Sequence, residues 1–522
     1  STINDASGNM LKDAIRWAPT LPVRNEDGSF FQIGELRVNP VSWQQLTDLT
    51  ERRSLIGNVR LNYDFTNWLS GNINLGHTNR FIERKVFVPA ANPSGATNGG
   101  VGSQDKIQNE NVLMELNLES NLNITENSNL RVLGGYSFQR FTTERNFVQA
   151  NDFVSDALKF NLLQSASNIQ SVASNKVSNR LASAFGRINY SLFNKYSLTF
   201  TIRGDGSSRF GENERWGIFP SAASAWTISD EAFLSSSDFI SNLKFRFGWG
   251  ITGNQEIPDF LFLEQLTVSG SETFSLGGQT IPAVLPSNFQ NPDLKWEETT
   301  QYNIGLDFGL FNDRFSGSVD YYLKNTDDLL LSFPTASPSV VNTQFANVGK
   351  VQNEGVELSL NADIISKSNF LWNTSFNWAT NDNEVKSLSS GQFSRERILI
   401  SPSSGVVNPA SNETQIVKPG LAIGTFFGRE FTGFDENGRE TYLDEDGDGN
   451  PDMVPIGNPH PDFTYGMTHN VNWKRFNFRV SVRGTVGNDI FNNTAAEFSA
   501  LNTFPSNNVL KSALNSGASI DQ

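Results

Sequence analysis

Residues 59–75 read VRLNYDFTNWLSGNINL, which is two runs of alternating apolar and polar residues joined by a short turn. Apolar side chains at every second position are typical of a β-strand whose two faces meet different surroundings. The same alternation recurs at 114–118, 304–308 and 463–467. Many such runs extend well beyond the mean of about 5–6 residues for strands of globular proteins. The chain is therefore predicted to consist mainly of long strands.

The connections between the predicted strands alternate in length. Short ones set aromatic residues beside a tight Asn, Lys or Asp turn, whereas long ones are polar and rich in Gly, Ser and Asn. The loop at 230–234 is intermediate and is predicted to contain a helical turn. The long connections are predicted at roughly 81–108, 145–179, 251–298, 327–351 and 381–461. The predicted strands are 55–65, 68–80, 109–124, 129–144, 180–192, 195–205, 220–228, 241–250, 299–310, 313–326, 352–365, 369–380, 462–472 and 476–488.

The composition excludes several classes of protein. The 522 residues include 40 Lys+Arg and 55 Asp+Glu, so the net charge is −15, and this acidic balance argues against a nucleic-acid partner. No run approaches the roughly 18–20 apolar residues of a membrane-spanning helix. The absence of cysteine removes disulfide frameworks, thiolate zinc sites and thiol catalysis. Aromatic residues are 11% of the chain, yet the mean hydropathy is −0.36, because polar residues are evenly interleaved with apolar ones.

Alternating short and long connections are typical of an outer-membrane β-barrel, which has tight periplasmic turns and long extracellular loops. In lipid every backbone polar group must be paired within the protein, so only helices and closed barrels can span. We therefore predict an all-β fold that is part of a large antiparallel transmembrane β-barrel, with outer-membrane lipid around its apolar face. The alternative is a soluble all-β protein, either a series of sandwiches or a propeller, although sandwich strands are shorter.

The ends of the chain give a prediction about domain organisation. Ser1 is not an initiator methionine and is not followed by a signal peptide, residues 1–44 contain no plug, and 489–522 end without a terminal strand. Residues 1–522 are therefore predicted to be one transmembrane β-barrel domain that is incomplete, an interior piece of a longer protein.

Several motifs occur in a fixed order along the chain. They are RGDGSSRFG at 203–211, RWGIFPS at 215–221, NPDLKWE at 291–297, NEGVE at 353–357, IGNPHPDFTYG at 456–466 and GNDIFN at 487–492. Together they resemble the signature of SusC/RagA-type TonB-linked outer-membrane proteins of Bacteroidetes. The likeness covers most of the chain.

The resemblance implies more than the residues alone. Such proteins are barrels of about 22 strands with a plugged lumen, so about 14 of them would be present here. They import nutrient oligosaccharides or peptides across the outer membrane, driven by TonB, and a SusD-like lipoprotein covers the extracellular face. The N-terminal plug, the region that binds TonB and the final strands are absent from this sequence.

The glycine-rich motif at 203–211 is predicted to hold loop structure at the barrel rim. Asp and Gly there suit a turn at the outer end of a strand. Arg203 and Arg209 flank this turn and are predicted to pair with Asp205 or Glu212. Direct contact with substrate is the alternative.

One acidic run has the spacing of a calcium loop, with oxygen-bearing side chains at relative positions 1, 3, 5, 7 and 9 and glycine at position 6. Pro455 occupies position 12, where a bidentate Glu is usual, so another residue must complete the ligand shell. A structural Ca²⁺ site is predicted, and a solvated acidic turn is the alternative. The predicted ligands are Asp444, Asp446, Asp448, Asn450 and Asp452.

No arrangement of residues suggests catalysis. The three His residues are scattered, and the chain has neither an HExxH motif nor a nucleophile elbow. The chain is therefore predicted not to be an enzyme. TonB-dependent import together with a SusD-like lid is the predicted function. A passive porin and a secreted β-rich binding protein or adhesin remain the alternatives.

Overall fold

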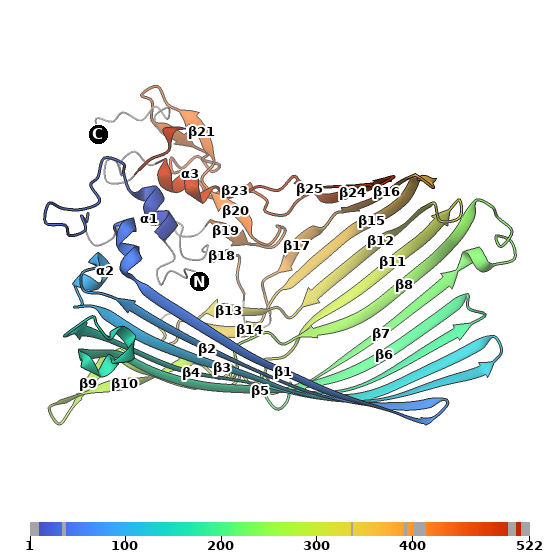
Figure 1. Ribbon diagram of the computed structural model, residues 1–522, viewed down its shortest axis with the longest axis horizontal. Coiled ribbons are helices and arrows are strands. Elements are labelled where there is room, and N and C mark those ends of the chain that lie inside the picture. The colour runs from blue at the N-terminus through green and yellow to red at the C-terminus, as the bar shows by residue number, and fades with distance from the viewer. Residues whose placement is uncertain are drawn as a thin grey trace.

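The computed structural model describes residues 10–33, 38–335, 338–390, 394–400, 414–499 and 508–512. Within these ranges one antiparallel sheet contains 15 strands, and its path is β1-β2-β3-β4-β5-β6-β7-β8-β11-β12-β15-β16-β24-β25, with β17 paired to β15. Figure 1 shows these strands side by side as a long curved wall around a central space. The predicted all-β, antiparallel architecture is confirmed.

Neighbouring strands on this path follow one another along the chain and are joined by hairpins or longer loops, except that β17 follows β16 and pairs with β15. The strands are β1 (Thr47–Thr66), β2 (Leu69–Val88), β3 (Val101–Thr125), β4 (Ser128–Phe153), β5 (Ala166–Leu192), β6 (Tyr196–Ser207), β7 (Trp216–Thr227), β8 (Ile240–Asn254), β11 (Glu297–Leu310), β12 (Phe315–Asp327), β15 (Lys350–Lys367), β16 (Phe370–Ala379), β17 (Asp382–Ser387), β24 (Phe463–Trp473) and β25 (Phe476–Val486).

Each predicted strand range overlaps one strand of the path, but several strands are longer than predicted at the end away from the short turns. β5 was predicted from residue 180 and begins at Ala166. Its additional residues pair with the outer half of β4, as Asn175 does with Arg145. Regular apolar alternation stops in this half, where Phe147 and Val148 are adjacent and lie opposite Ala173 and Val172, yet backbone pairing continues. The period of two therefore marks only the part of each strand that has one apolar face.

The connections predicted as long loops contain secondary structure of their own, which the sequence patterns did not indicate. Two hairpins stand on the β8–β11 and β12–β15 connections, and the β16–β24 connection contains a four-stranded sheet and a further hairpin. Their strands are β9 (Gln265–Leu276), β10 (Gln279–Asn288), β13 (Leu330–Pro334), β14 (Thr343–Asn347), β18 (Ile398–Ile400), β19 (Gln415–Val417), β20 (Thr425–Gly428), β23 (Val454–Gly457), β21 (Phe431–Phe434) and β22 (Glu440–Tyr442).

The helices are short and are not part of the wall; they lie in the connections and in the segments before β1 and after β25. They are α1 (Met10–Arg16), η1 (Pro40–Gln45), α2 (Pro93–Ala96), η2 (Lys159–Asn161), η3 (Leu163–Ser165), η4 (Ile228–Asp230) and α3 (Asn493–Phe498). In the described ranges no helix has both the length and the apolar character needed to cross a membrane.

The short turns reverse the chain with residues of positive φ. Phe193 and Asn194 adopt φ values of 53° and 57° between β5 and β6, and Lys474 adopts 52° between β24 and β25. Tight hairpins need such angles to match the twist of the strands they join. In the intermediate connection between β7 and β8, the Ser235 N–H donates to the Glu231 carbonyl at 2.8 Å, which confirms the predicted helical turn.

The two faces of the wall differ in chemistry. Leu61 lies opposite Ile73, which lies opposite Leu116, and this apolar row leaves Leu61 60% exposed. One residue further along, Asn62 lies opposite Asn72 and accepts a hydrogen bond from its side chain. Exposed apolar rows on long strands require a non-aqueous neighbour, whereas amide side chains suit a hydrated lumen.

Aromatic side chains gather where the strands meet the short turns. Trp68, Phe193, Phe311, Trp473 and Phe476 are all exposed at this end. Amphipathic aromatic rings at the ends of a lipid-facing surface form the interfacial girdle of outer-membrane barrels. The aromatic residues that the sequence sets beside the short turns therefore form such a girdle at the turn end of the wall.

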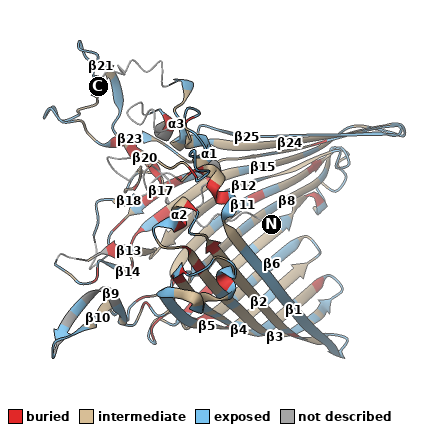
Figure 2. Cartoon of the chain, turned by 60° about the vertical axis from the view of Figure 1, so that its left-hand side comes forward, coloured by how far each residue is buried: buried red, intermediate tan, exposed pale blue. Residues whose placement is uncertain are grey.

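The buried residues lie mainly at the other end of the molecule. Figure 2 shows buried positions concentrated where the long connections meet the strand ends, while most of the wall is intermediate or exposed. A barrel wall is one sheet thick and encloses no core of its own. The buried apolar clusters therefore form where the long connections pack against the strand ends.

Candidate functional site

The described parts of the long connections and the adjoining strand ends form several buried apolar clusters, and the one with the most buried members is here called the mouth cluster. Its members come from the β6–β7 connection, from β7, and from both ends of the β8–β11 connection. Three separate segments thus share one core at the end of the wall opposite the short turns. The mouth cluster consists of Phe210, Phe219, Ile257, Leu261, Leu294 and Trp296.

Trp296 is the centre of this packing. Its ring lies 5.1 Å from that of Phe210 and 5.4 Å from that of Phe219, and its indole N–H donates to the Arg215 carbonyl at 3.2 Å. Gly211 lets the β6–β7 connection approach closely, because a Cβ there would lie 2.7 Å from the Pro292 carbonyl oxygen. The residues of two motifs therefore hold two loops against each other.

Ion pairs at the rim agree only in part with the prediction. Arg203 pairs with Asp205 at 2.8 Å, as predicted. Arg209 does not reach Asp205 or Glu212 but pairs with Asp259 at 3.0 Å and Glu256 at 3.2 Å. Its neighbour in the chain is the fully buried Phe210, and this packing places Arg209 against the loop that follows β8. The motif at 203–211 thus ties two loops together, which agrees with the predicted structural role.

Asn347 joins the β8–β11 connection to the β12–β15 connection. Its side-chain amide donates to the carbonyls of Lys295 at 2.8 Å and Asp328 at 3.0 Å, and its side-chain oxygen accepts from the Lys295 N–H at 2.9 Å. One asparagine therefore satisfies three backbone groups of two loops. These contacts give Asn347 a structural role that the sequence alone did not indicate.

The last two motifs are paired with each other beyond the ends of β24 and β25. The Asn458 N–H donates to the Asp489 carboxylate at 2.8 Å, and the Asp489 N–H donates to the Asn458 carbonyl at 2.7 Å. Gly487 adopts a φ of +89°, and a Cβ there would lie 2.1 Å from the Asp462 carboxylate. The motifs therefore fix the point where the loops leave the wall.

Charged groups on the polar face of the wall are paired across strands. Arg246 of β8 contacts Asp307 of β11 at 2.7 Å and Asp320 of β12 at 3.0 Å. Phe245 and Phe247, on either side of it in the chain, face the other way, because side chains alternate along a strand. A hydrated, hydrogen-bonding surface therefore lines the inner side below the mouth cluster.

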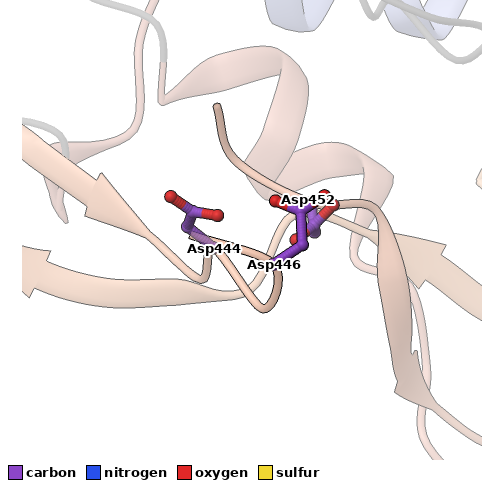
Figure 3. A group of neighbouring side chains, drawn as sticks. All are labelled: Asp444, Asp446 and Asp452. Carbon is purple, nitrogen blue, oxygen red and sulfur yellow. The ribbon is translucent and has the colours of Figure 1, made fainter. Parts of the chain in front are cut away.

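The acidic run lies between β22 and β23, in the longest predicted connection. Single carboxylate oxygens of Asp444, Asp446 and Asp452 come within 4.8 Å of one another, and Figure 3 shows the three side chains around one turn. Asp448 is not in this group, and its carboxylate accepts the Asn450 N–H at 2.7 Å. The structure thus brings together three of the five predicted ligands.

Backbone hydrogen bonds shape this acidic loop. The two oxygens of the Asp444 carboxylate accept the N–H groups of Gly447 at 2.8 Å and Gly449 at 2.9 Å. Both glycines have positive φ, 72° and 87°. Three hard oxygen donors fit a calcium ion, which takes six to eight oxygens, so further ligands would have to come from water or carbonyl groups. The calcium site stays a prediction.

Long antiparallel strands with an apolar outer row, a polar inner face, an aromatic girdle at the turns and loops folded over the opposite end are the features of an outer-membrane β-barrel. A comparison with protein families agrees with this class. The chain belongs to the family described as "TonB dependent receptor-like, beta-barrel", whose model matches residues 4–488. This family consists of receptors and transporters of the outer membrane, not of enzymes.

Two curated relatives and one solved structure specify the type. TonB-dependent receptor P3 of Formosa agariphila is 32% identical over 512 residues, which are 94% of this chain and 50% of that protein. TonB-dependent receptor SusC of Bacteroides thetaiotaomicron is 37% identical over 321 residues, 60% of this chain and 32% of that protein. The structure of the RagAB peptide transporter has a TM-score of 0.80 at 23% identity, over 93% of this chain and 54% of that one.

The SusC/RagA-type resemblance suggested by the motifs is therefore confirmed. The likeness to RagAB shows the fold, since its sequence identity is low. The chain spans about half the length of the curated relative that matches most of it.

Proposed function

We propose that this chain forms most of the barrel of an importer that takes up nutrient oligosaccharides or peptides across the outer membrane. A SusD-like surface lipoprotein would cover its mouth, and TonB would act through an N-terminal region outside this sequence. The observation that carries the proposal is the mouth cluster, which folds three loop segments into one body above a polar inner face. A passive pore has no need of such a body.

Uptake measurements test this proposal. Cells expressing the full receptor and its lid are given fluorescent maltoheptaose or a fluorescent hexapeptide. We expect uptake of one ligand class, lost when TonB or the lid is deleted. Uptake that survives the loss of TonB would favour a porin. Binding of neither class by the purified receptor with its lid would count against import.

We further propose that the acidic loop holds a structural Ca²⁺. Three like charges within 4.8 Å repel one another unless a cation neutralises them, and a cation would also order a long connection. The role we propose is structural, because the ion would be held by hard oxygen ligands of one loop and would link parts of that loop. The loop lies on the side of the long connections, where extracellular calcium would reach it.

Asp446→Asn with Asp452→Asn should remove this site and leave the barrel folded. We expect the loop of the unchanged receptor to resist limited proteolysis at calcium concentrations above about 10⁻⁴–10⁻³ M, the range of extracellular calcium modules. The double variant should be cleaved with and without calcium. Asp448→Asn is the matched control and should behave like the unchanged receptor, because its carboxylate lies outside the group. Calcium-independent cleavage of the unchanged receptor would contradict the site.

A further inference from the structure

A pocket of about 760 Å³ lies between the small sheet of the β16–β24 connection and the segment that follows β25. We call it the mouth pocket. Its walls are mainly aliphatic and aromatic side chains of β18, β20, β23 and the segment after β25, and they include Leu399, Phe426, Met453, Ile456 and Phe491. These elements belong to the end of the wall where the long connections fold together.

The apolar walls are open to solvent. Ile456 is 50% exposed, Met453 40% and Phe491 39%. Phe426 and Phe491 contact each other with ring centroids 6.5 Å apart, so they form one continuous apolar wall. A contiguous exposed apolar surface with a polar rim is typical of a site that binds a ligand or a partner.

Two cations border this apolar surface. The guanidinium carbon of Arg397 lies 5.4 Å from the ring centroid of Phe427, and Arg429 lines the same pocket. In the part of the chain that the structure describes, neither side chain has a carboxylate within ion-pairing distance, although the chain carries a net charge of −15. Asp489 also lines the pocket, but its carboxylate accepts the Asn458 N–H at 2.8 Å.

Arg429 and Tyr442 line the same pocket. The pKa of Tyr442 is raised above its ordinary value, first by the hydrogen bond of its hydroxyl to Glu440 and then by burial, and Arg429 opposes this rise. A guanidinium group recognises a carboxylate with two parallel hydrogen bonds, and such charge-assisted bonds are the strong ones.

We propose that the mouth pocket binds the C-terminal end of a short peptide, with Arg397 and Arg429 on the terminal carboxylate and an apolar last side chain against Ile456 and Phe491. This deepens the proposed import function and rests on it. A peptide with an apolar last residue presents an apolar side chain beside its terminal carboxylate. This arrangement matches the apolar walls of the pocket beside its two cations. Sugar sites need many hydrogen-bonding groups along an aromatic face, and aliphatic side chains such as Leu399 and Met453 offer none.

Binding of three tetrapeptides to the full receptor with its lid tests the assignment. The first consists of three alanines and a C-terminal phenylalanine, the second is its C-terminal amide, and the third is tetra-alanine. We expect the free acid to bind at least tenfold more tightly than the amide and several-fold more tightly than tetra-alanine. Arg397→Gln with Arg429→Gln should abolish the preference for the acid, and Ile456→Ser should abolish the preference for phenylalanine.

The matched control removes two positive charges at the opposite end of the wall. Lys474→Gln with Arg475→Gln, in the β24–β25 turn, should keep the tenfold preference. Equal binding of acid and amide, or equal loss in the control, would overturn the assignment. Tighter, arginine-dependent binding of a glucuronate-terminated trisaccharide would also overturn it in favour of an acidic glycan. If TonB-dependent uptake persists while these peptides show no preference, only the pocket assignment fails, and the import proposal stands.

Discussion

Replacing Leu61 by arginine is expected to destabilise the barrel by about 2–4 kcal/mol, the cost measured for cations at the lipid face of outer-membrane barrels near the bilayer midplane. Leu61 belongs to the apolar row of β1 and lies opposite Ile73. Leu61 lies further from the short β1–β2 turn than Trp68, which belongs to the aromatic girdle, so the Leu61 side chain is in the hydrocarbon layer. The measurement is the midpoint of reversible urea unfolding in lipid vesicles.

Asn62→Arg is the matched control, because it introduces the same side chain one residue away on the opposite face. Asn62 accepts a hydrogen bond from Asn72, and the loss of one such bond costs only about 0.5–1.5 kcal/mol. A guanidinium group in the hydrated lumen adds little further cost. Equal destabilisation at both positions would show that the two faces of the wall have been assigned wrongly.

Trp296→Ala is expected to cost about 3–5 kcal/mol, which is typical of truncating a buried aromatic side chain. Trp296 is 6% exposed, packs against Phe210 in a tilted and against Phe219 in an edge-on geometry, and donates a hydrogen bond to the Arg215 carbonyl. Because Trp296 joins the β6–β7 connection to the β8–β11 connection, the loss should appear as loop opening while the wall stays paired. Hydrogen exchange should accelerate in the β6–β7 and β8–β11 connections and not in β11 or β12.

Trp216→Ala provides the comparison for this variant. Trp216 lies in a neighbouring motif but is 61% exposed, so its removal leaves no cavity in the mouth cluster. We expect its hydrogen-exchange pattern to match that of the unchanged receptor. If Trp296→Ala left the loops protected as well, the mouth cluster would not be what holds them together.

The wall could be predicted from the sequence because lipid and water impose a period of two on every spanning segment. Val59, Leu61 and Tyr63 carry that period without reference to any distant residue. The outer half of β5 could not be predicted, since above the lipid the strand is held by backbone pairing to β4, which leaves no pattern in side-chain type. The small strands in the long connections could not be predicted either, because their backbone pairing also leaves no pattern in side-chain type.

For the folded loops at the mouth, the sequence indicated the motifs but not which of their residues contact one another. Phe210 and Trp296 are distant in sequence, and the residue that pairs with Arg209 is Asp259, on another loop, rather than the nearby Glu212. Sequence spacing likewise located the acidic loop but not which carboxylates converge in it. No sequence pattern marked Arg397 and Arg429 of the mouth pocket, because whether a guanidinium group has a carboxylate partner is known only from the structure around it.

Cysteine labelling in living cells tests the central claim most directly, because this chain contains no cysteine that would give a background. Asn437→Cys places one thiol between β21 and β22 on a long connection, and Ser368→Cys places one in the short β15–β16 turn, both at exposed positions. With a maleimide that cannot cross the outer membrane, Asn437→Cys should be labelled in intact cells, and Ser368→Cys only after the outer membrane is permeabilised. Equal labelling of both thiols in intact cells, or labelling of Ser368→Cys alone, would contradict a transmembrane barrel with its turns inside and its folded mouth outside.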